Sequence, residues 1–147
     1  MDAVILWSIP VFIFSIAAEW LYARRSGLAA YAEPRDTWAN LAMGLGNVVI
    51  SAVMKTVILG AYFLAYRFRP FEIPPTAAWA WLLLLFADDL CYYAFHRMHH
   101  RVRLLWCTHV NHHSSERFNF AVALRQPWTE PLTAPWFWLP LPLLGFH

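Results

Sequence analysis

Six of the chain's seven histidines fall inside 18 consecutive positions, an arrangement suited to binding metal ions. They are His96, His99, His100, His109, His112 and His113. Imidazole is the commonest metal-binding side chain and suits iron, zinc, copper and nickel, whereas calcium or magnesium would need oxygen ligands, which are scarce in this stretch. The histidine cluster therefore predicts a transition-metal site.

Helical spacing would place two of the first three histidines and a nearby carboxylate on one face. On an α-helix that turns about 100° per residue, Asp89, His96 and His100 lie within about 20° of one another, and His99 lies about 80° away. Asp89 is thus placed either to bind a metal ion or to accept a hydrogen bond from a ligand imidazole. The adjacent Asp88 points about 100° away from that face and fits better as a carboxylate that reaches the membrane surface.

The second group of histidines repeats this logic after a connection over residues 101–108. His109, His112 and His113 have i, i+3, i+4 spacing, so one helical turn would present all three imidazoles to one side. Two such faces would make a site with more than one metal ion geometrically easy. A histidine-rich tract can also be a nonspecific chelator, but the ordered spacing favours a built site.

Both groups lie in longer motifs that resemble the sterol desaturase/fatty acid hydroxylase superfamily. The first histidine box of that superfamily, H-R-x-x-H, matches His96, Arg97 and His100. Its second box, L-W-x-x-H-x-x-H-H-S, matches Leu105, Trp106, His109, His112, His113 and Ser114. The similarity continues through Asn119, Leu124, Arg125 and Glu130. His99 falls on a variable position of the pattern, so we do not expect it to be a ligand.

The resemblance implies a membrane-bound oxidoreductase that hydroxylates or desaturates a lipid with O2, and sterol, fatty acyl, alkyl ether and carotenoid substrates all remain open. It implies two iron ions, with ligands His96, His100, His109, His112 and His113. Further ligands, or residues that orient the ligands, would be Asp89, Asn119, Arg125 and Glu130. Arg97 and Arg125 are expected to hold carboxylates such as Glu116 or Glu130, although Arg97 fits a membrane anchor equally well. Because the chain shows no flavin, haem or nicotinamide motif, the electrons are expected to come from a separate electron-transfer protein or reductase.

The chain departs from the superfamily in one respect. Members complete the site with a third histidine box further downstream, whereas His147 follows an apolar run and forms no box. We therefore expect residues 1–147 to be a single membrane domain, the N-terminal portion of a longer enzyme, and inactive when isolated.

Composition places the chain among membrane proteins. Hydrophobic residues make up 60% of it and charged residues only 14%, which is too apolar for a soluble domain of this length. We expect an all-α, polytopic domain with spans at about 3–22, 38–66 and 76–95, a histidine region at 96–130, and a proline-rich apolar segment at 131–146 that is not a regular span. The Gly44-Leu-Gly46 sequence indicates close packing within a span. The dispersed basic residues and net charge of +2 do not suggest nucleic-acid binding.

The distribution of basic residues predicts the orientation. If the first span ends in the cytoplasm, that side carries eight of the eleven basic residues, namely Arg24, Arg25, Arg35, Arg97, Arg101, Arg103, Arg117 and Arg125. The opposite side keeps Arg67 and Arg69. The positive-inside rule then places the histidine cluster in the cytoplasm.

Two other classes of protein are compatible with the composition. A non-enzymatic membrane protein could bind metal or haem through the same histidines, and a structural membrane protein could carry them incidentally. Neither class requires the Leu-Trp, His-His-Ser and Leu-Arg residues that flank the histidines, so the sequence favours the oxygenase.

Overall fold

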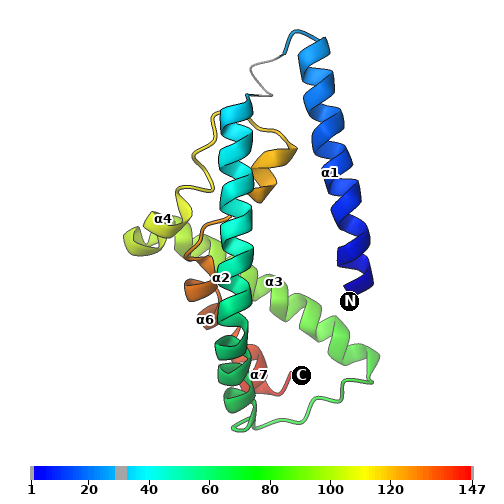
Figure 1. The fold of residues 1–147 in the computed structure, drawn as a ribbon. Helices are drawn as coiled ribbons and strands as arrows, with labels where there is room; N and C mark the ends of the chain where they lie inside the picture. Colours follow the sequence, from blue (N-terminus) through cyan, green and yellow to red (C-terminus); the bar gives the residue numbers. More distant parts are fainter. Residues whose placement is uncertain (1, 29–32, 147) are drawn as a thin grey trace. The chain divides into compact units, whose positions relative to one another are not determined.

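A computed structural model describes residues 2–28 and 33–146, and these residues form helices and no strand. The order is α1 (Asp2–Arg25), α2 (Pro34–Tyr66), α3 (Ala78–Arg101), α4 (Arg103–His109), the 3-10 helix η2 (Phe120–Leu124), α5 (Glu130–Thr133), α6 (Pro135–Trp138) and α7 (Pro140–Leu144) (Figure 1). The all-α expectation is confirmed. The chain forms two compact units: the first contains Met1–Gly46 and Asn111–Pro127, and the second contains Asn47–Val110 and Trp128–His147.

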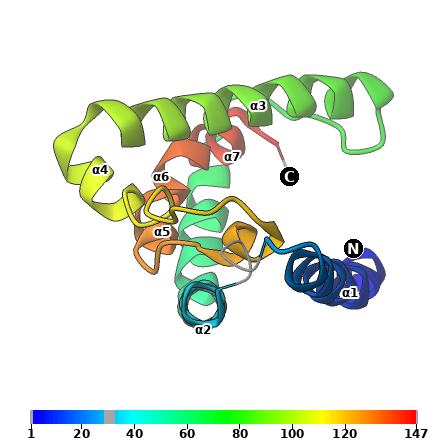
Figure 2. The same ribbon diagram turned by 90° about the horizontal axis from the view of Figure 1, so that it is seen from above.

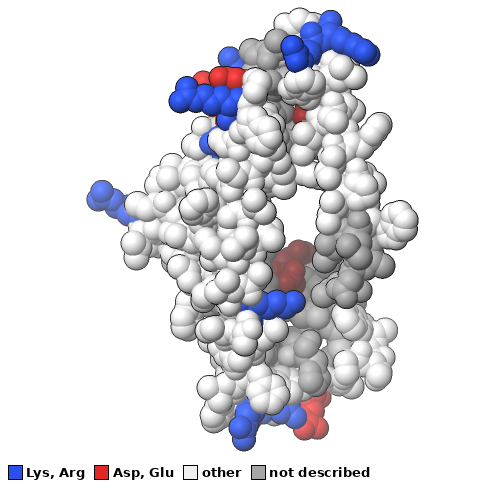
Figure 3. Space-filling view, in the orientation of Figure 1, with Lys and Arg blue, Asp and Glu red and all other residues white. Residues whose placement is uncertain are grey.

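Within the described residues, α2 and α3 are long and apolar enough to cross a membrane. At 1.5 Å per residue, their 33 and 24 residues measure roughly 50 and 36 Å, against about 30 Å for a bilayer core. Only 6% of the most apolar 18-residue stretch of α2 is buried. Most of the surface in Figure 3 carries no charge. Such exposed apolar surface supports a membrane protein. A span at 3–22, inside α1, stays a prediction.

Local sequence signals set the ends of the long helices. Pro34 and Asp36 favour a helix start, so α2 begins before the expected residue 38. Helix α3 continues to Arg101, past the expected end of the span at 95, and therefore carries the first three histidines. The connection between the first two expected spans includes residues 29–32, which lie outside the described residues, as does His147.

Prolines divide the segment after Glu130 into short helices. Helices α5, α6 and α7 each have a proline in the first two helical positions. Because proline lacks a backbone N–H, it is tolerated at a helix start but interrupts a longer helix. Helix α7 ends at Gly145, whose φ of 105° is in the left-handed region. A Cβ atom at Gly145 would also collide with the backbone of Phe71, so glycine is required there.

Aromatic side chains hold α6 against α3 in the second unit, where α6 and α7 lie along α3 (Figure 2). The ring of Phe95 packs 5.6 Å, between centroids, from each of the rings of Phe137 and Trp138. The Nε1–H of Trp138 donates to a carboxylate oxygen of Asp88 at 2.7 Å. We expected Asp88 to reach the membrane surface. In the structure its carboxylate also accepts a hydrogen bond from a side chain of the second unit.

Close packing at Gly44 occurs in the first unit, against η2 rather than against a second membrane span. A Cβ atom at Gly44 would lie 2.8 Å from the carbonyl oxygen of Leu124 and 3.1 Å from its Cβ. We predict that Gly44→Ala lowers stability by about 1–3 kcal/mol, a typical cost of overpacking, measured by thermal unfolding in detergent. Gly60→Ala is the matched control, since a Cβ there meets nothing within 4 Å. Equal unfolding temperatures of the two variants would contradict this packing.

Candidate metal centre

Three imidazoles converge in the second unit where α4 folds back on α3. His96 and His100 lie one turn apart at the end of α3, with their Nε2 atoms 3.1 Å apart. The helix is broken at Val102, whose extended backbone (φ −98°, ψ 119°) reverses the chain into α4. His109, the last residue of α4, then places its ring centroid 5.0 Å from those of both His96 and His100. Potential ligand atoms of the three residues lie within 4.8 Å of one another.

This geometry fits a transition-metal ion. Two imidazole nitrogens bound to one ion at about 2.0–2.1 Å and at right angles would be separated by roughly 3 Å, close to the 3.1 Å observed. His109 is buried whereas His100 is exposed, so solvent reaches part of the site. In their neutral forms these residues provide nitrogen donors suited to iron, zinc or copper.

His99 is a packing residue, as its place in the motif predicted. It is 1% exposed, its Nδ1 lies 2.8 Å from the carbonyl oxygen of Phe95, and its Nε2 lies 3.1 Å from Thr133 Oγ1. A carbonyl only accepts hydrogen bonds, so the Nδ1–H of His99 donates to the Phe95 carbonyl. Both nitrogens of His99 are therefore engaged inside the protein.

The second histidine group does not lie on one helix, so that prediction was wrong. Helix α4 ends at His109, and His112 and His113 follow in a turn that belongs to the first unit. Ser114 closes this turn, because both its backbone N–H and its hydroxyl donate to the carbonyl of Asn111, at 3.2 and 2.7 Å. Asn and Ser side chains that bond nearby backbone compete with helix formation. By contrast, the expected connection at 101–108 is mostly helical. Its Leu and Trp side chains do not compete with the helix for backbone hydrogen bonds in this way.

His112 is oriented by the main chain of Arg125. Its Nδ1 lies 3.0 Å from the Arg125 carbonyl oxygen, so Nδ1–H donates to that carbonyl. This is the arrangement in which metal-binding histidines present Nε2 to the metal while the second nitrogen fixes the ring. The ring of His113 lies 5.1 Å from that of His112, between centroids.

The side chain of Arg125 is the centre of a buried polar network in the first unit. The guanidinium donates to Asp36 Oδ1 at 2.7 Å, to Asn40 Oδ1 at 2.6 Å and to Ser114 Oγ at 2.6 Å. Arg125 is 8% exposed and Asn40 is fully buried. The other oxygen of Asp36 accepts from Ser115 Oγ at 3.0 Å and from the Asn40 amide at 3.3 Å. The network thus links the first turns of α2 to the residues around His112.

These contacts correct the expected partners of the two arginines. The carboxylate that Arg125 holds is Asp36, not Glu116 or Glu130. Arg97 is exposed and donates to the hydroxyl of Tyr93 at 2.8 Å, with its guanidinium over that ring, which fits an anchoring role. Sequence reasoning missed Asp36 and Asn40. Their spacing of four residues at the start of an apolar helix was the available signal.

The remaining candidates occupy different places and stay predictions as ligands or orienting residues. Asp89 is exposed on α3, and the metal-ligand group found among the described residues contains histidines and no carboxylate. Asn119 caps η2 by accepting the N–H of Val122 at 3.2 Å. Glu130 begins α5, where its carbonyl accepts from Thr133 Oγ1 at 3.3 Å. Through Thr133, α5 is therefore connected to His99.

The fold and the site are those of a helical membrane protein with a histidine cluster that could hold a metal ion. The fatty acid hydroxylase family model matches residues 81–147. The chain is 34% identical over 136 residues to alkylglycerol monooxygenase of Danio rerio, an alignment that covers 92% of this chain and 30% of that protein. It is 33% identical over 109 residues to the human protein of the same name, covering 74% of this chain and 24% of that protein.

Alkylglycerol monooxygenase of Caenorhabditis elegans is 38% identical over 92 residues, which covers 62% of this chain and 18% of that protein. The chain therefore spans less than a third of the length of these curated relatives. No solved structure matches it significantly. The chain belongs to the fatty acid hydroxylase/sterol desaturase superfamily.

Proposed function

We propose that this chain is part of a membrane-bound, non-haem di-iron monooxygenase that hydroxylates an ether lipid of the alkylglycerol type. The convergence of His96, His100 and His109 is the observation that carries the proposal. Of the lipids and reactions that the sequence left open, the relatives named alkylglycerol monooxygenase favour an alkyl ether and hydroxylation over a sterol, a fatty acid or desaturation.

The proposed ligands of the two iron ions are the five histidines of both motifs. Three of them already converge in the second unit, and only Val110 and Asn111 separate His109 from His112 along the chain. With its Nδ1–H donating to the Arg125 carbonyl, His112 would bind a metal ion through Nε2. Bound iron would supply the activation of O2. The protein orients the imidazoles and keeps bulk water from the lipid chain.

An apolar cavity in the second unit is suited to the hydrocarbon chain of such a lipid. It has a volume of about 510 Å³ and lies between α2, α3, α6 and α7, with Leu59, Phe63, Leu84 and Leu141 among its walls. Ligand sites for small molecules are typically apolar cavities of this size. A chain dissolved in the bilayer could enter between helices without crossing water.

The remaining parts of the proposal concern electrons and orientation. A separate electron-transfer protein or reductase would reduce the iron, because the sequence contains no flavin, haem or nicotinamide motif. The excess of basic residues around the histidine-bearing segment and at the ends of the spans on the same side favours the placement of the histidines in the cytoplasm.

The test is oxygen consumption by the intact protein in detergent, supplied with iron, a chemical reductant and an O-alkylglycerol. We expect O2 uptake that depends on the lipid and matches the amount of hydroxylated or cleaved ether formed. A sterol and a free fatty acid, offered in the same micelles, are expected to give little uptake. Iron-loaded, folded protein that consumes no O2 with any of the three lipids would contradict the proposal and favour a non-enzymatic metal-binding protein.

A further inference from the structure

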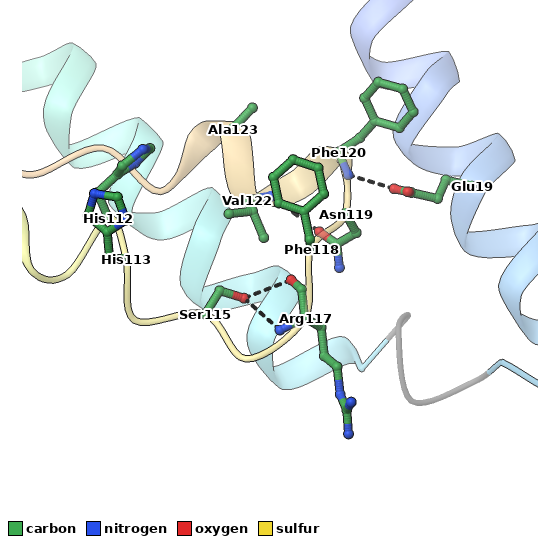
Figure 4. A pocket seen from close by; sticks show the side chains of 10 residues that line it. All are labelled: Glu19, His112, His113, Ser115, Arg117, Phe118, Asn119, Phe120, Val122 and Ala123. Atoms are coloured by element: carbon green, nitrogen blue, oxygen red, sulfur yellow. Dashed lines mark hydrogen bonds between the residues drawn. The ribbon is translucent and has the colours of Figure 1, made fainter.

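The first unit contains a cavity of about 450 Å³ beside the second histidine group (Figure 4). His112 and His113 contribute to its lining, together with Glu19 from α1 and the segment around η2. Its walls are of two kinds, since Glu19 and Arg117 are charged while Phe118 and Phe120 are aromatic. Phe118 is 91% exposed, so its ring is an accessible apolar surface at the edge of the cavity.

Glu19 is an unusual residue for its position. It is the one charged residue in the apolar run from Ala3 to Tyr22, and carboxylates in apolar membrane helices are costly and commonly mark functional sites. Its Oε2 accepts the backbone N–H of Phe120 at 2.7 Å, a contact between residues 101 positions apart (Figure 4). A carboxylate has about four acceptor sites, so this hydrogen bond leaves capacity to accept from a ligand.

We propose that this cavity binds the hydroxyl-bearing polar end of the lipid substrate, with Glu19 accepting a hydrogen bond from a substrate hydroxyl. A hydroxyl both donates and accepts, and the pocket wall offers it an acceptor in Glu19. Because the Glu19 carboxylate repels like charge, the wall suits a neutral headgroup better than a carboxylate or a phosphate. The exposed ring of Phe118 gives the start of the hydrocarbon chain an apolar contact.

The assignment rests on the proposed function and is tested with Glu19→Gln in the intact, iron-loaded protein. Glutamine keeps an oxygen that can accept the Phe120 N–H, so the attachment of the η2 segment is preserved while the charge is lost. The probes are an O-alkylglycerol and its bis-O-methyl ether, which has no hydroxyl. For the alkylglycerol we expect KM to rise roughly tenfold or more, the usual effect of weakening a hydrogen bond to a charged group. For the bis-methyl ether KM is expected to change less than about twofold, with iron content unchanged.

Glu72→Gln is the matched control, because the Glu72 side chain is 87% exposed and pairs with Arg69 in the second unit. It is expected to leave both KM values unchanged. Equal effects of Glu19→Gln on the two lipids, or no effect on either, would overturn the assignment. Equilibrium binding of the two lipids, measured without turnover, tests the headgroup pocket independently of the proposed oxygenase activity. A wild-type protein that turns over neither lipid, yet binds the alkylglycerol more tightly than its ether in a Glu19-dependent way, contradicts the oxygenase and supports the pocket.

Discussion

Replacing His100 with alanine is expected to lower iron affinity by at least about 100-fold and to abolish oxygen-dependent turnover. Removal of residues that only orient metal ligands already costs about 10–100-fold, and His100 Nε2 lies 3.1 Å from that of His96. The fold should be retained, since His100 is exposed and its loss leaves no cavity in the core. Elemental analysis of the purified variant and its thermal unfolding temperature give the two readouts.

Met98→Ala is the control for this substitution, because Met98 is an exposed side chain on the same helix, two residues before His100. It is expected to keep both the iron and the activity of the wild type. A His100→Ala protein with wild-type iron content and turnover would contradict the assignment of His100 as a ligand.

Replacing Asp36 with alanine is expected to destabilise the first unit by about 3–5 kcal/mol, the typical cost of leaving one member of a buried ion pair without its partner. The guanidinium of Arg125 would remain buried and lose its carboxylate, and Asn40 and Ser115 would each lose a hydrogen-bond acceptor. Denaturant unfolding in detergent measures the loss. Asp36→Asn keeps acceptor oxygen in place and should recover part of it.

Because the Arg125 main chain fixes His112, Asp36→Ala should also reduce iron content in the protein that remains folded. Glu72→Ala provides the comparison, since it breaks the exposed pair with Arg69 and such pairs contribute about 0–1 kcal/mol. Similar stabilities of the Asp36→Ala and Glu72→Ala proteins would show that the Arg125 network is not a structural centre of the unit.

Local patterns predicted much of the helical structure. The apolar runs gave helices at α2 and α3, and the i, i+4 spacing of His96 and His100 placed both on one helical face, because these signals depend on residues within a turn of one another. The same rule failed for His112 and His113. There the Asn111–Ser114 turn and the bond to the Arg125 carbonyl, 13 residues away, prevail over helical spacing.

Contacts between distant segments were the part that the sequence did not reveal. Asp36 and Arg125 are 89 residues apart, and several other acidic residues were equally plausible partners for the arginine. The partner of Glu19 is a backbone N–H, which every residue except proline possesses, so no side-chain pattern could have indicated it. Glu19 is the one charge in its apolar run, but this pattern does not indicate which group the side chain contacts.

The most direct test of the metal centre is elemental analysis of the intact, detergent-purified protein. Wild type should be compared with a variant in which alanine replaces His96, His100, His109, His112 and His113 together. We predict two iron ions per chain in the wild type and none in the folded variant. Folded wild-type protein that binds no transition metal, or a variant that retains its iron, would contradict the assignment of these histidines as the ligands of a di-iron centre.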